Sequence, residues 1–247
     1  VVNRYEIAKH HSATHLLQSA LKMVLGDTVS QAGSLNDSTR LRFDFTYPKA
    51  MTTAQIDEVE DLVNSMISRG IIGNVEELPI EQAKNKGAIA MFGEKYGDTV
   101  RVVSFSDVSV EFCGGTHVRN TADIGSFYIV KESGVSAGVR RIEAVCGTAA
   151  IAYTKEIINS MNEIKIEIKN NDVIAGIKKL KEQIKDLKKE IETVQSQTSA
   201  PINEEMIGDT KVVVAIVENG DLKKIVDDLK NANEKLAILL LQAKDDK

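Results

Sequence analysis

The spacing of hydrophobic residues changes along the chain, and each change predicts a different element. Apolar residues recur at helical spacing over residues 5–25, and Gly26 provides a stop for that helix. Residues 31–35 (QAGSL) have the composition of a turn. In residues 41–45 (LRFDF), apolar and charged residues alternate, which is typical of a strand with one buried face. The first part of the chain therefore mixes helix with half-buried strand.

A second amphipathic helix is predicted next, because apolar residues again form a stripe. Thr52 or Thr53 is the expected N-cap, and Gly70 ends the helix. A short strand over residues 73–79 leads to a helical turn that begins at Glu81. We interpret these elements as structural, because none of them carries a candidate catalytic or binding motif.

Period-two patterns dominate the following stretch. Strands are predicted over residues 100–105, 108–112, 125–130 and 140–146. A turn at residues 106–107 joins the first pair, and a flexible glycine-containing loop over residues 134–138 precedes the last strand. The sequence therefore predicts an α+β domain over residues 1–148, an antiparallel sheet with helices.

From residue 149 the apolar residues follow heptad spacing, which predicts coiled-coil helices up to residue 199. The break at residues 170–172 contains Asp172, a good N-cap for the second helix. Isoleucine at position a and leucine at position d favour a parallel two-stranded coil. The break favours an antiparallel hairpin within one chain, and we prefer the hairpin.

The last part, residues 200–247, is predicted to be the front of a larger α/β domain. A linker is expected over residues 195–210, and strands over residues 212–216 and 236–241 flank a helix capped by Asp221. Such a β-α-β unit is small for a core of its own. The chain begins with valine and reaches a motif within ten residues, so we expect a piece of a longer protein.

Composition narrows the class of protein only slightly. The 247 residues carry a net charge of −5, so no dominant basic surface for nucleic acid is expected, although a local basic patch is compatible with this total. Two cysteines cannot form a disulfide framework, which fits a reducing compartment such as the cytoplasm. No apolar run approaches the roughly 20 residues of a membrane span, and we expect no membrane partner.

Two short motifs carry the candidate chemistry. His11 and His15 lie one helical turn apart, so one metal ion can reach both. Cys113 and His117 flank two glycines at the end of a predicted strand, where the backbone can turn both side chains toward one point. Three imidazoles and one thiolate make a tetrahedral zinc set, and one Zn²⁺ per chain is expected.

Other polar residues allow two interpretations each. Arg140 and Arg141 follow the glycine-containing loop and could hold a phosphate, or they could form surface ion pairs. Cys146 lies in an apolar run, and we interpret it as a small buried hydrophobic residue rather than as a metal ligand.

The motifs together identify a family. The chain resembles the C-terminal half of alanyl-tRNA synthetases over nearly its whole length, beginning near the start of their editing domain. The stretches that match are HSATH (11–15), QAGSL (31–35), LRFDF (41–45), FGEKYGD (92–98), VEFCGGTH (110–117) and GVRRIEA (138–144). Two positions depart from the family pattern, which usually has lysine at Ala32 and histidine at Tyr47. The first departure puts in doubt a tRNA or substrate contact near Gln31.

The resemblance implies a zinc-containing tRNA editing domain (residues 1–148), coiled-coil helices (149–199) and the start of a tRNA-binding and dimerising domain (200–247). It implies zinc held by His11, His15, Cys113 and His117, and hydrolysis of tRNA(Ala) wrongly charged with serine or glycine. The implied partners are the acceptor end of tRNA(Ala), the remainder of the synthetase and a second copy bound through the C-terminal region. The aminoacylation motifs are absent, so no activation of alanine is expected.

Roles for individual residues follow as hypotheses. Gln31 and Thr14 are candidates for sensing the serine hydroxyl, and the amides of Gly114 and Gly115 for holding a developing oxyanion. Residues expected to contact substrate or tRNA are Arg42, Arg140 and Arg141. Four protein ligands close a zinc site, so zinc is expected to position the tRNA 3′ end, with metal-hydroxide attack as the second mechanism.

Two rival interpretations remain open. One is the same chemistry in a free-standing editing protein or in threonyl-tRNA synthetase, which the heptad helices and the β-α-β unit argue against. The other is a non-catalytic, zinc-stabilised tRNA-binding and dimerisation module, which predicts that no ester hydrolysis occurs.

Overall fold

The structure is a computed structural model that describes the chain apart from residues 1, 91–95, 198–202, 218–221, 233 and 243–247. It divides into two compact units, Val1–Ser160 and Met161–Lys247, with the boundary inside a helix. Among the described residues, every helix is too short or too polar to cross a membrane.

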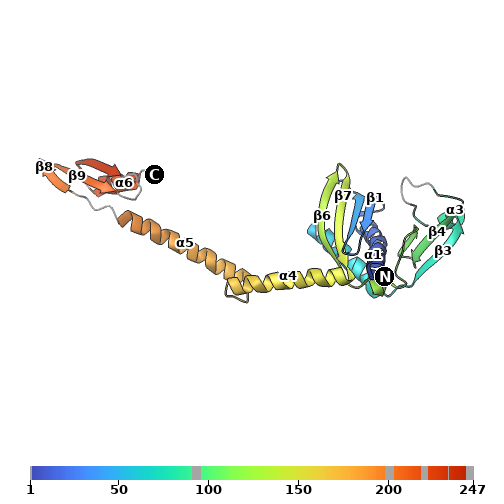
Figure 1. Cartoon of the computed structure of the whole chain (residues 1–247). Helices are drawn as coiled ribbons and strands as arrows, with labels where there is room; N and C mark the ends of the chain where they lie inside the picture. The colour runs from blue at the N-terminus through green and yellow to red at the C-terminus, as the bar shows by residue number, and fades with distance from the viewer. Residues whose placement is uncertain (1, 91–95, 198–202, 218–221, 233, 243–247) are drawn as a thin grey trace. The chain divides into compact units, whose positions relative to one another are not determined.

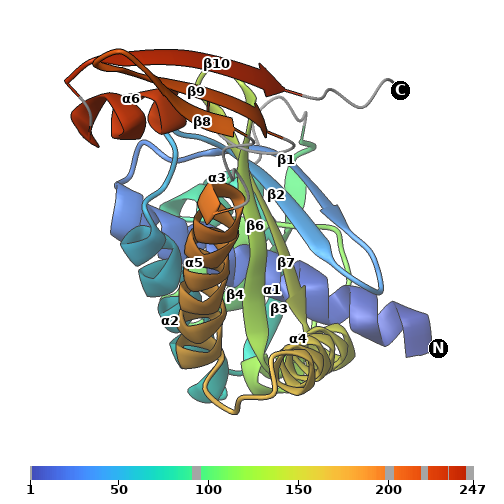
Figure 2. The ribbon, with the colours of Figure 1, turned by 90° about the vertical axis from the view of Figure 1, so that its left-hand side faces the viewer.

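A four-stranded antiparallel sheet forms one side of the first unit (Figure 2). Its order is β1–β2–β7–β6, with β1 at Gln31–Asn36, β2 at Leu41–Thr46, β6 at Phe127–Ser136 and β7 at Val139–Cys146. Phe43 and Phe45 of β2 and Ile142 of β7 are fully buried on one face. The alternation seen in the sequence therefore marks the core side of this sheet, as predicted.

A second antiparallel sheet of order β3–β4–β5 completes the first unit. Its strands are β3 (Gly73–Pro79), β4 (Thr99–Phe105) and β5 (Ser109–Phe112), and helix α3 (Ile80–Asn85) follows β3. The predicted turn is confirmed, since Ser106 adopts a positive φ of 52° between β4 and β5. Part of the FGEKYGD motif lies in residues 91–95, outside the described residues.

Helix α1 (Val2–Leu25) lies between the two sheets (Figure 1). Its central residues are buried, including Leu16, Leu17 and Leu21, so it forms the core of the unit. Helix α2 (Thr53–Ser68) packs against α1 and is capped by Thr52, whose side chain accepts a hydrogen bond from the Gln55 amide. A 3₁₀ turn at Thr121–Ile124 contacts both helices. The predicted α+β class is confirmed.

Two predicted loops of the first unit are wrong in detail. Residues 31–35 form strand β1, with a bulge between Gln31 and Gly33, because pairing with β2 outweighs the turn-like composition. The expected flexible loop at residues 134–138 is mostly strand, since β6 continues to Ser136. The turn to β7 is left to two residues, and Gly138 supplies the positive φ of 73°.

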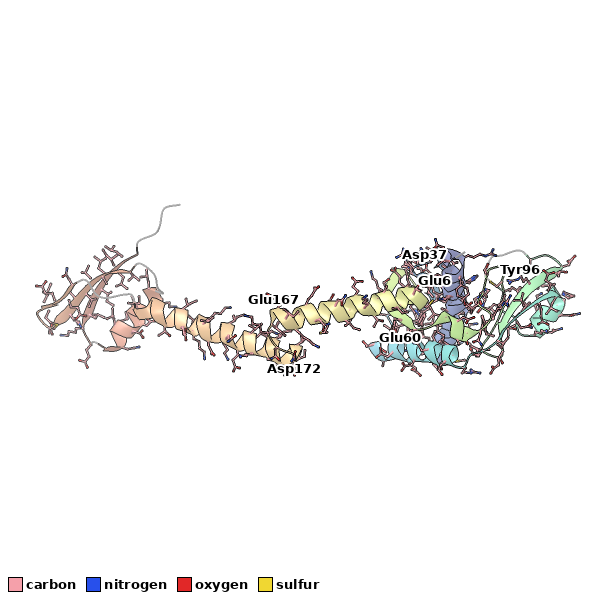
Figure 3. All side chains as sticks on the ribbon, turned by 60° about the horizontal axis from the view of Figure 1, so that its bottom comes forward. Glu6, Asp37, Glu60, Tyr96, Glu167 and Asp172 are labelled. Atoms are coloured by element: carbon pink, nitrogen blue, oxygen red, sulfur yellow. The ribbon has the colours of Figure 1, made fainter. Side chains whose placement is uncertain are left out.

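Helices α4 (Gly147–Glu167) and α5 (Val173–Gln197) follow, and α4 crosses the boundary between the units. Glu167 and Asp172 lie on either side of the turn between them (Figure 3). Asp172 accepts a hydrogen bond from the Ala175 amide, which confirms it as the cap of α5. Most of the heptad residues of α5 that are described are exposed, for example Ile184 and Leu187. A coiled-coil hairpin therefore stays a prediction.

The second unit ends in a three-stranded sheet of order β10–β9–β8 with helix α6. The elements are β8 (Asn203–Ile207), β9 (Thr210–Val217), α6 (Leu222–Ala232) and β10 (Leu236–Gln242). Strands β9 and β10 pair in parallel, which confirms the β-α-β unit. The predicted linker at residues 195–210 is partly wrong, because it contains strand β8. A turn with a positive φ at Gly208 joins β8 to β9, and the two strands pair. Asp221, the expected cap of α6, lies outside the described residues.

Candidate metal and substrate site

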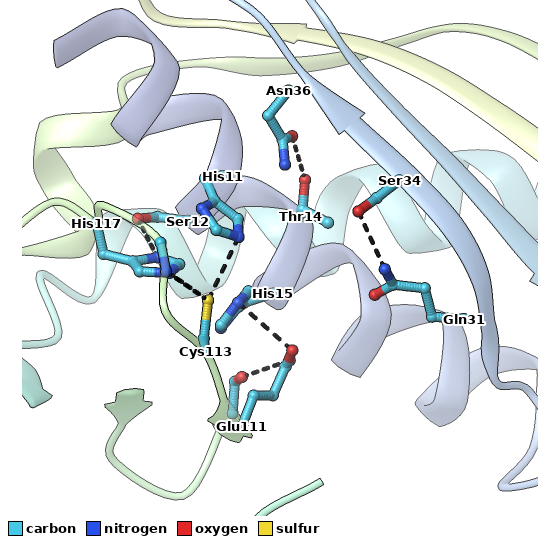
Figure 4. Close-up of polar contacts among 12 residues, drawn as sticks. His11, Ser12, Thr14, His15, Gln31, Ser34, Asn36, Glu111, Cys113 and His117 are labelled. Carbon is cyan, nitrogen blue, oxygen red and sulfur yellow. Dashed lines mark hydrogen bonds and ion pairs between the residues drawn. The ribbon is translucent and has the colours of Figure 1, made fainter. Parts of the chain in front are cut away.

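The two sequence motifs meet in the first unit (Figure 4). His11 and His15 project from one side of α1, and Cys113 and His117 belong to the loop that follows β5. The four side chains each offer a ligand atom, and these atoms lie within 4.8 Å of one another. Residues about a hundred positions apart in sequence thus form a single cluster.

The distances within the cluster suit a tetrahedral ion. The Cys113 Sγ atom lies 3.5 Å from Nε2 of His11 and 3.2 Å from Nε2 of His117. In a tetrahedral zinc site, with bonds of 2.0–2.3 Å, neighbouring ligand atoms are about 3.4–3.6 Å apart. His15 Nδ1 is buried without a hydrogen-bond partner among the described residues, as expected for a ligand atom. Three nitrogens and one sulfur are also the donor types that zinc prefers.

Burial keeps all three imidazoles neutral. Together with the neighbouring His11, it lowers the pKa of His15 to about 3. Burial also lowers the pKa of His11, helped by the positive charge of Arg101. The pKa of His117 is lowered by burial and by the other two histidines. Because a metal ion binds the neutral form of imidazole, the lowered pKa values favour metal binding by these histidines near neutral pH.

The glycines allow the loop to approach α1 closely. A Cβ atom on Gly115 would lie 2.0 Å from Cε1 of His11, which no real contact permits. A Cβ atom on Gly114 would meet nothing within 4 Å. The Gly115 amide donates a hydrogen bond to the Cys113 sulfur, so it is turned toward the cluster. Gly115 is required by space, and Gly114 is not.

Arg101 of β4 holds the loop in place, and sequence reasoning did not single it out. Its Nη1 atom donates hydrogen bonds to the carbonyl oxygens of Cys113, at 2.5 Å, and Gly115, at 2.9 Å. An arginine within an alternating strand gives no sign of such a role. Only the pairing of β4 with β5 brings it to the loop.

Two more residues beside the cluster, Ser12 and Glu111, are found only in the structure. Ser12 is fully buried, and its Oγ atom lies 3.0 Å from Nδ1 of His117 and accepts a hydrogen bond from the Val118 amide. Glu111 is buried beside His15, and burial raises the pKa of its carboxyl to about 7. His10 lies apart from the cluster: its Nδ1 is 3.0 Å from the Glu6 carbonyl oxygen, and its Nε2 accepts from the Cys146 amide. His10 is thus a buried structural residue.

A cavity of about 430 Å³ opens beside the cluster. His11, Arg101, Cys113, Gly114 and Gly115 all contribute to its wall. A small organic group in this cavity would therefore lie against the cluster and the loop backbone. This is the arrangement expected of a site that holds a ligand next to a metal.

Gln31 and Thr14 lie on the side of the site near β1 (Figure 4). Gln31 donates a hydrogen bond to Ser34 and lines a smaller cavity of about 200 Å³, whose wall also includes Glu111. Thr14 is buried, and its hydroxyl lies within hydrogen-bond distance of the Asn36 side chain and the His10 carbonyl oxygen. Gln31 lies on β1, which the sequence suggested was a turn, and Thr14 lies on α1, one residue before the proposed ligand His15.

The three candidate arginines lie on β2 and β7 of the four-stranded sheet and have acidic neighbours. Arg140 forms a two-pronged ion pair with Glu132, and Arg141 forms another with Asp44. Arg42 Nε lies 3.8 Å from the same Asp44 and has no hydrogen-bond partner among the described residues. None of them lines the cavities described above. The ion-pair interpretation of Arg140 and Arg141 thus describes their contacts in the structure.

Comparison with known proteins extends these observations. Residues 100–143 match the family model described as "Threonyl and Alanyl tRNA synthetase second additional domain". The chain is 86% identical over all 247 residues to alanine–tRNA ligase of Aliarcobacter butzleri (strain RM4018) and covers 29% of that protein. It is 54% identical over 245 residues, 99% of the chain, to the ligase of Sulfurovum sp. (strain NBC37-1), again covering 29%. It is 53% identical over 244 residues, 99% of the chain, to the ligase of Helicobacter pylori (strain Shi470), and it covers 28% of that protein.

Proposed function

Because the chain belongs to the alanine–tRNA ligase family, as a segment less than a third as long as its relatives, we propose that it is the editing part of such an enzyme. The proposed reaction is hydrolysis of the ester that joins serine or glycine to tRNA(Ala). A pocket made for alanine discriminates poorly against glycine, which lacks one methyl group, and serine, which adds one hydroxyl. Binding differences of this size give only about 10–200-fold selectivity, so a second, hydrolytic site is needed.

The observation that carries this proposal is the cluster of His11, His15, Cys113 and His117, of which His11 and Cys113 line the wall of a cavity. We propose that it holds one Zn²⁺. When bound, zinc would order the cavity and position the 3′ end of the tRNA. The chain's own residues hold the loop rigid around this point, through the Arg101 hydrogen bonds and the close approach of Gly115 to His11.

Contacts to the substrate are proposed for both sides of the cluster. Gln31 and Thr14 approach from the β1 side and are suited to sense the serine hydroxyl. The Gly115 amide already donates to the Cys113 sulfur, so the Gly114 amide is the better candidate for holding an oxyanion. Arg42, Arg140 and Arg141 are proposed to meet the tRNA backbone, and for two of them this requires exchange of an acidic partner for phosphate.

The proposed partners are the acceptor end of tRNA(Ala), the remainder of the ligase and a second copy of the chain. The second copy is proposed to bind through the C-terminal region, where heptad residues of α5 are exposed. A chain that acts on tRNA during protein synthesis is expected in the cytoplasm.

The direct test is release of amino acid from charged tRNA(Ala) by the 247-residue chain. Release from seryl- and glycyl-tRNA(Ala), with alanyl-tRNA(Ala) left intact, is the expected result. The alternative is a non-catalytic, zinc-stabilised module that binds tRNA and dimerises. It predicts no release from any of the three at concentrations where tRNA binding is measured.

A further inference from the structure

Each imidazole of the cluster has a second nitrogen, and the structure shows what that nitrogen meets. We infer that Glu111 is a positioning residue that holds His15 with Nδ1 toward the metal, so that the site combines one Nδ1 ligand with two Nε2 ligands. The inference rests on the proposed metal site and deepens it. It concerns how the protein orients the ligands, which determines the geometry of the site.

Two histidines point their Nε2 atoms at the cluster. Nε2 of His11 and Nε2 of His117 are the atoms that lie near the Cys113 sulfur. On the far side of the ring, His117 Nδ1 lies 3.0 Å from the Ser12 hydroxyl. The His11 ring forms a hydrogen bond with the backbone of Thr116. Each of these two rings is therefore held on its far side by a residue of the other motif. Ser12 of α1 holds His117, and Thr116 of the loop after β5 holds His11.

His15 has the reverse orientation. Its Nε2 atom lies 3.4 Å from Oε2 of Glu111, and its Nδ1 atom is buried with no hydrogen-bond partner among the described residues. The ring nitrogens of an imidazole point in different directions, so a ring whose Nε2 faces Glu111 presents Nδ1 elsewhere. Because His15 belongs to the cluster, the unpartnered Nδ1 is the atom left to bind the metal.

Glu111 is itself held in place. Its side chain projects from β5, and Oε1 accepts a hydrogen bond of 2.8 Å from the Ser109 hydroxyl two residues earlier on the same strand. Both residues are buried. Figure 4 shows the contact between Glu111 and His15. A fixed carboxylate facing the Nε2–H of a metal-bound histidine is a known means of orienting the ring and strengthening the ligand.

The charges agree with this arrangement. A divalent ion with three neutral imidazoles and one thiolate leaves one positive charge in a buried place. An ionised Glu111 carboxylate would balance that charge through His15. Loss of the carboxylate would leave the charge uncompensated, which is costly in a buried site.

The nitrogen assignment can be measured directly on the intact chain. The protein is labelled with ¹⁵N in its histidine rings and loaded with ¹¹³Cd²⁺ in place of zinc, and the cadmium–nitrogen couplings are recorded by NMR. Only four histidines contribute signals. Couplings to Nδ1 of His15 and to Nε2 of His11 and His117 are expected. Coupling to Nε2 of His15 would overturn the assignment while leaving the metal site intact, and no bound metal would overturn both.

A second measurement tests the role of Glu111 without the catalytic activity. Competition with a chelator gives the zinc affinity of Glu111→Ala, Glu111→Gln and Glu58→Ala, the last removing an exposed carboxylate on α2. Removing such a partner typically costs about 10–100-fold in metal affinity, and that loss is expected for Glu111→Ala. Glu111→Gln keeps an acceptor oxygen for His15 but loses the negative charge, so it should recover part of the affinity, and Glu58→Ala should equal the parent. Parent-like affinity in Glu111→Ala, or an equal loss in Glu111→Gln, would contradict the positioning role.

Discussion

Two neighbouring glycines in the loop after β5 differ in the space around them. Replacing Gly115 with alanine would force the new methyl group into the His11 ring, whereas the same change at Gly114 meets open space. We expect Gly115→Ala to cost about 1–3 kcal/mol of stability through overpacking and to weaken zinc binding at least about tenfold by displacing a ligand. Thermal melting and chelator competition measure the two effects.

Gly114→Ala is the matched control, since it adds the same methyl group one residue earlier. It should stay within about 0.5 kcal/mol of the parent and keep its zinc affinity. Equal behaviour of the two variants would show that the loop does not approach His11 as closely as described.

The buried histidines also predict a pH dependence of the metal-free protein. Their pKa values are lowered in the folded state, and that of His15 is lowered to about 3. Between pH 7 and pH 5, the unfolded chain therefore takes up more protons on these groups than the folded chain does. The free energy of unfolding therefore decreases as the pH falls from 7 to 5, by about 2 kcal/mol for His15 alone.

Glu111 opposes this trend in the same range. Its pKa is raised to about 7, so the folded state keeps a proton that the unfolded state releases, and its contribution grows as the pH falls toward 4.5. Four histidines act against one carboxyl group, so the net stability should decrease. Urea unfolding in the presence of a chelator at pH 7 and pH 5 measures the difference. An unchanged or higher midpoint at pH 5 would be inconsistent with neutral, buried imidazoles.

At the scale of elements, α2 offers a test of its predicted start. Thr52 and Gln55 form reciprocal hydrogen bonds at the helix N-terminus, and Thr53 is the first helical residue. Thr52→Ala should lower the free energy of unfolding by about 1 kcal/mol, since it removes the cap. Thr53→Ala should change it by less than about 0.5 kcal/mol. Urea unfolding followed by circular dichroism compares them, and a larger loss for Thr53→Ala would place the cap one residue later.

The same scale shows what the sequence could predict. Local patterns predicted α1, α2, β2 and the β-α-β unit, because burial imposes its period on every residue of such elements. The predictions for residues 31–35 and 134–138 were wrong. Glycine and serine there suggested a turn and a loop, but a neighbouring strand supplies hydrogen bonds to both stretches.

For the candidate site, the ligand set could be predicted because both halves carry short, distinctive motifs. The supporting residues could not be. Ser12 meets His117 across 105 positions, and Glu111 meets His15 across nearly as many. Neither residue stands out in its own element, because a serine in a helix or a glutamate in a strand has many ordinary uses. Such contacts depend on tertiary packing, which no local pattern encodes.

At the scale of the whole molecule, the exposed heptad seam of α5 predicts association. Ile184 and Leu187 are more than half exposed, and they repeat at the spacing of a coiled coil. If a second copy covers them, the chain should be a dimer at micromolar concentration, and Ile184→Lys should make it a monomer. Lys185→Glu, at the next position and outside the seam, is the control. Light scattering gives the mass, and a monomeric parent at every concentration would contradict dimerisation through α5.

The central claim is that the metal cluster is where mischarged tRNA is hydrolysed. The most direct measurement is the rate of serine release from seryl-tRNA(Ala) by the parent chain and by two cysteine variants. Cys113→Ala removes a proposed ligand, and Cys146→Ala removes the buried cysteine at the end of β7. Hydrolysis by the parent and by Cys146→Ala, with none by a folded Cys113→Ala, is the result we predict. Equal hydrolysis by all three would show that the reaction takes place elsewhere.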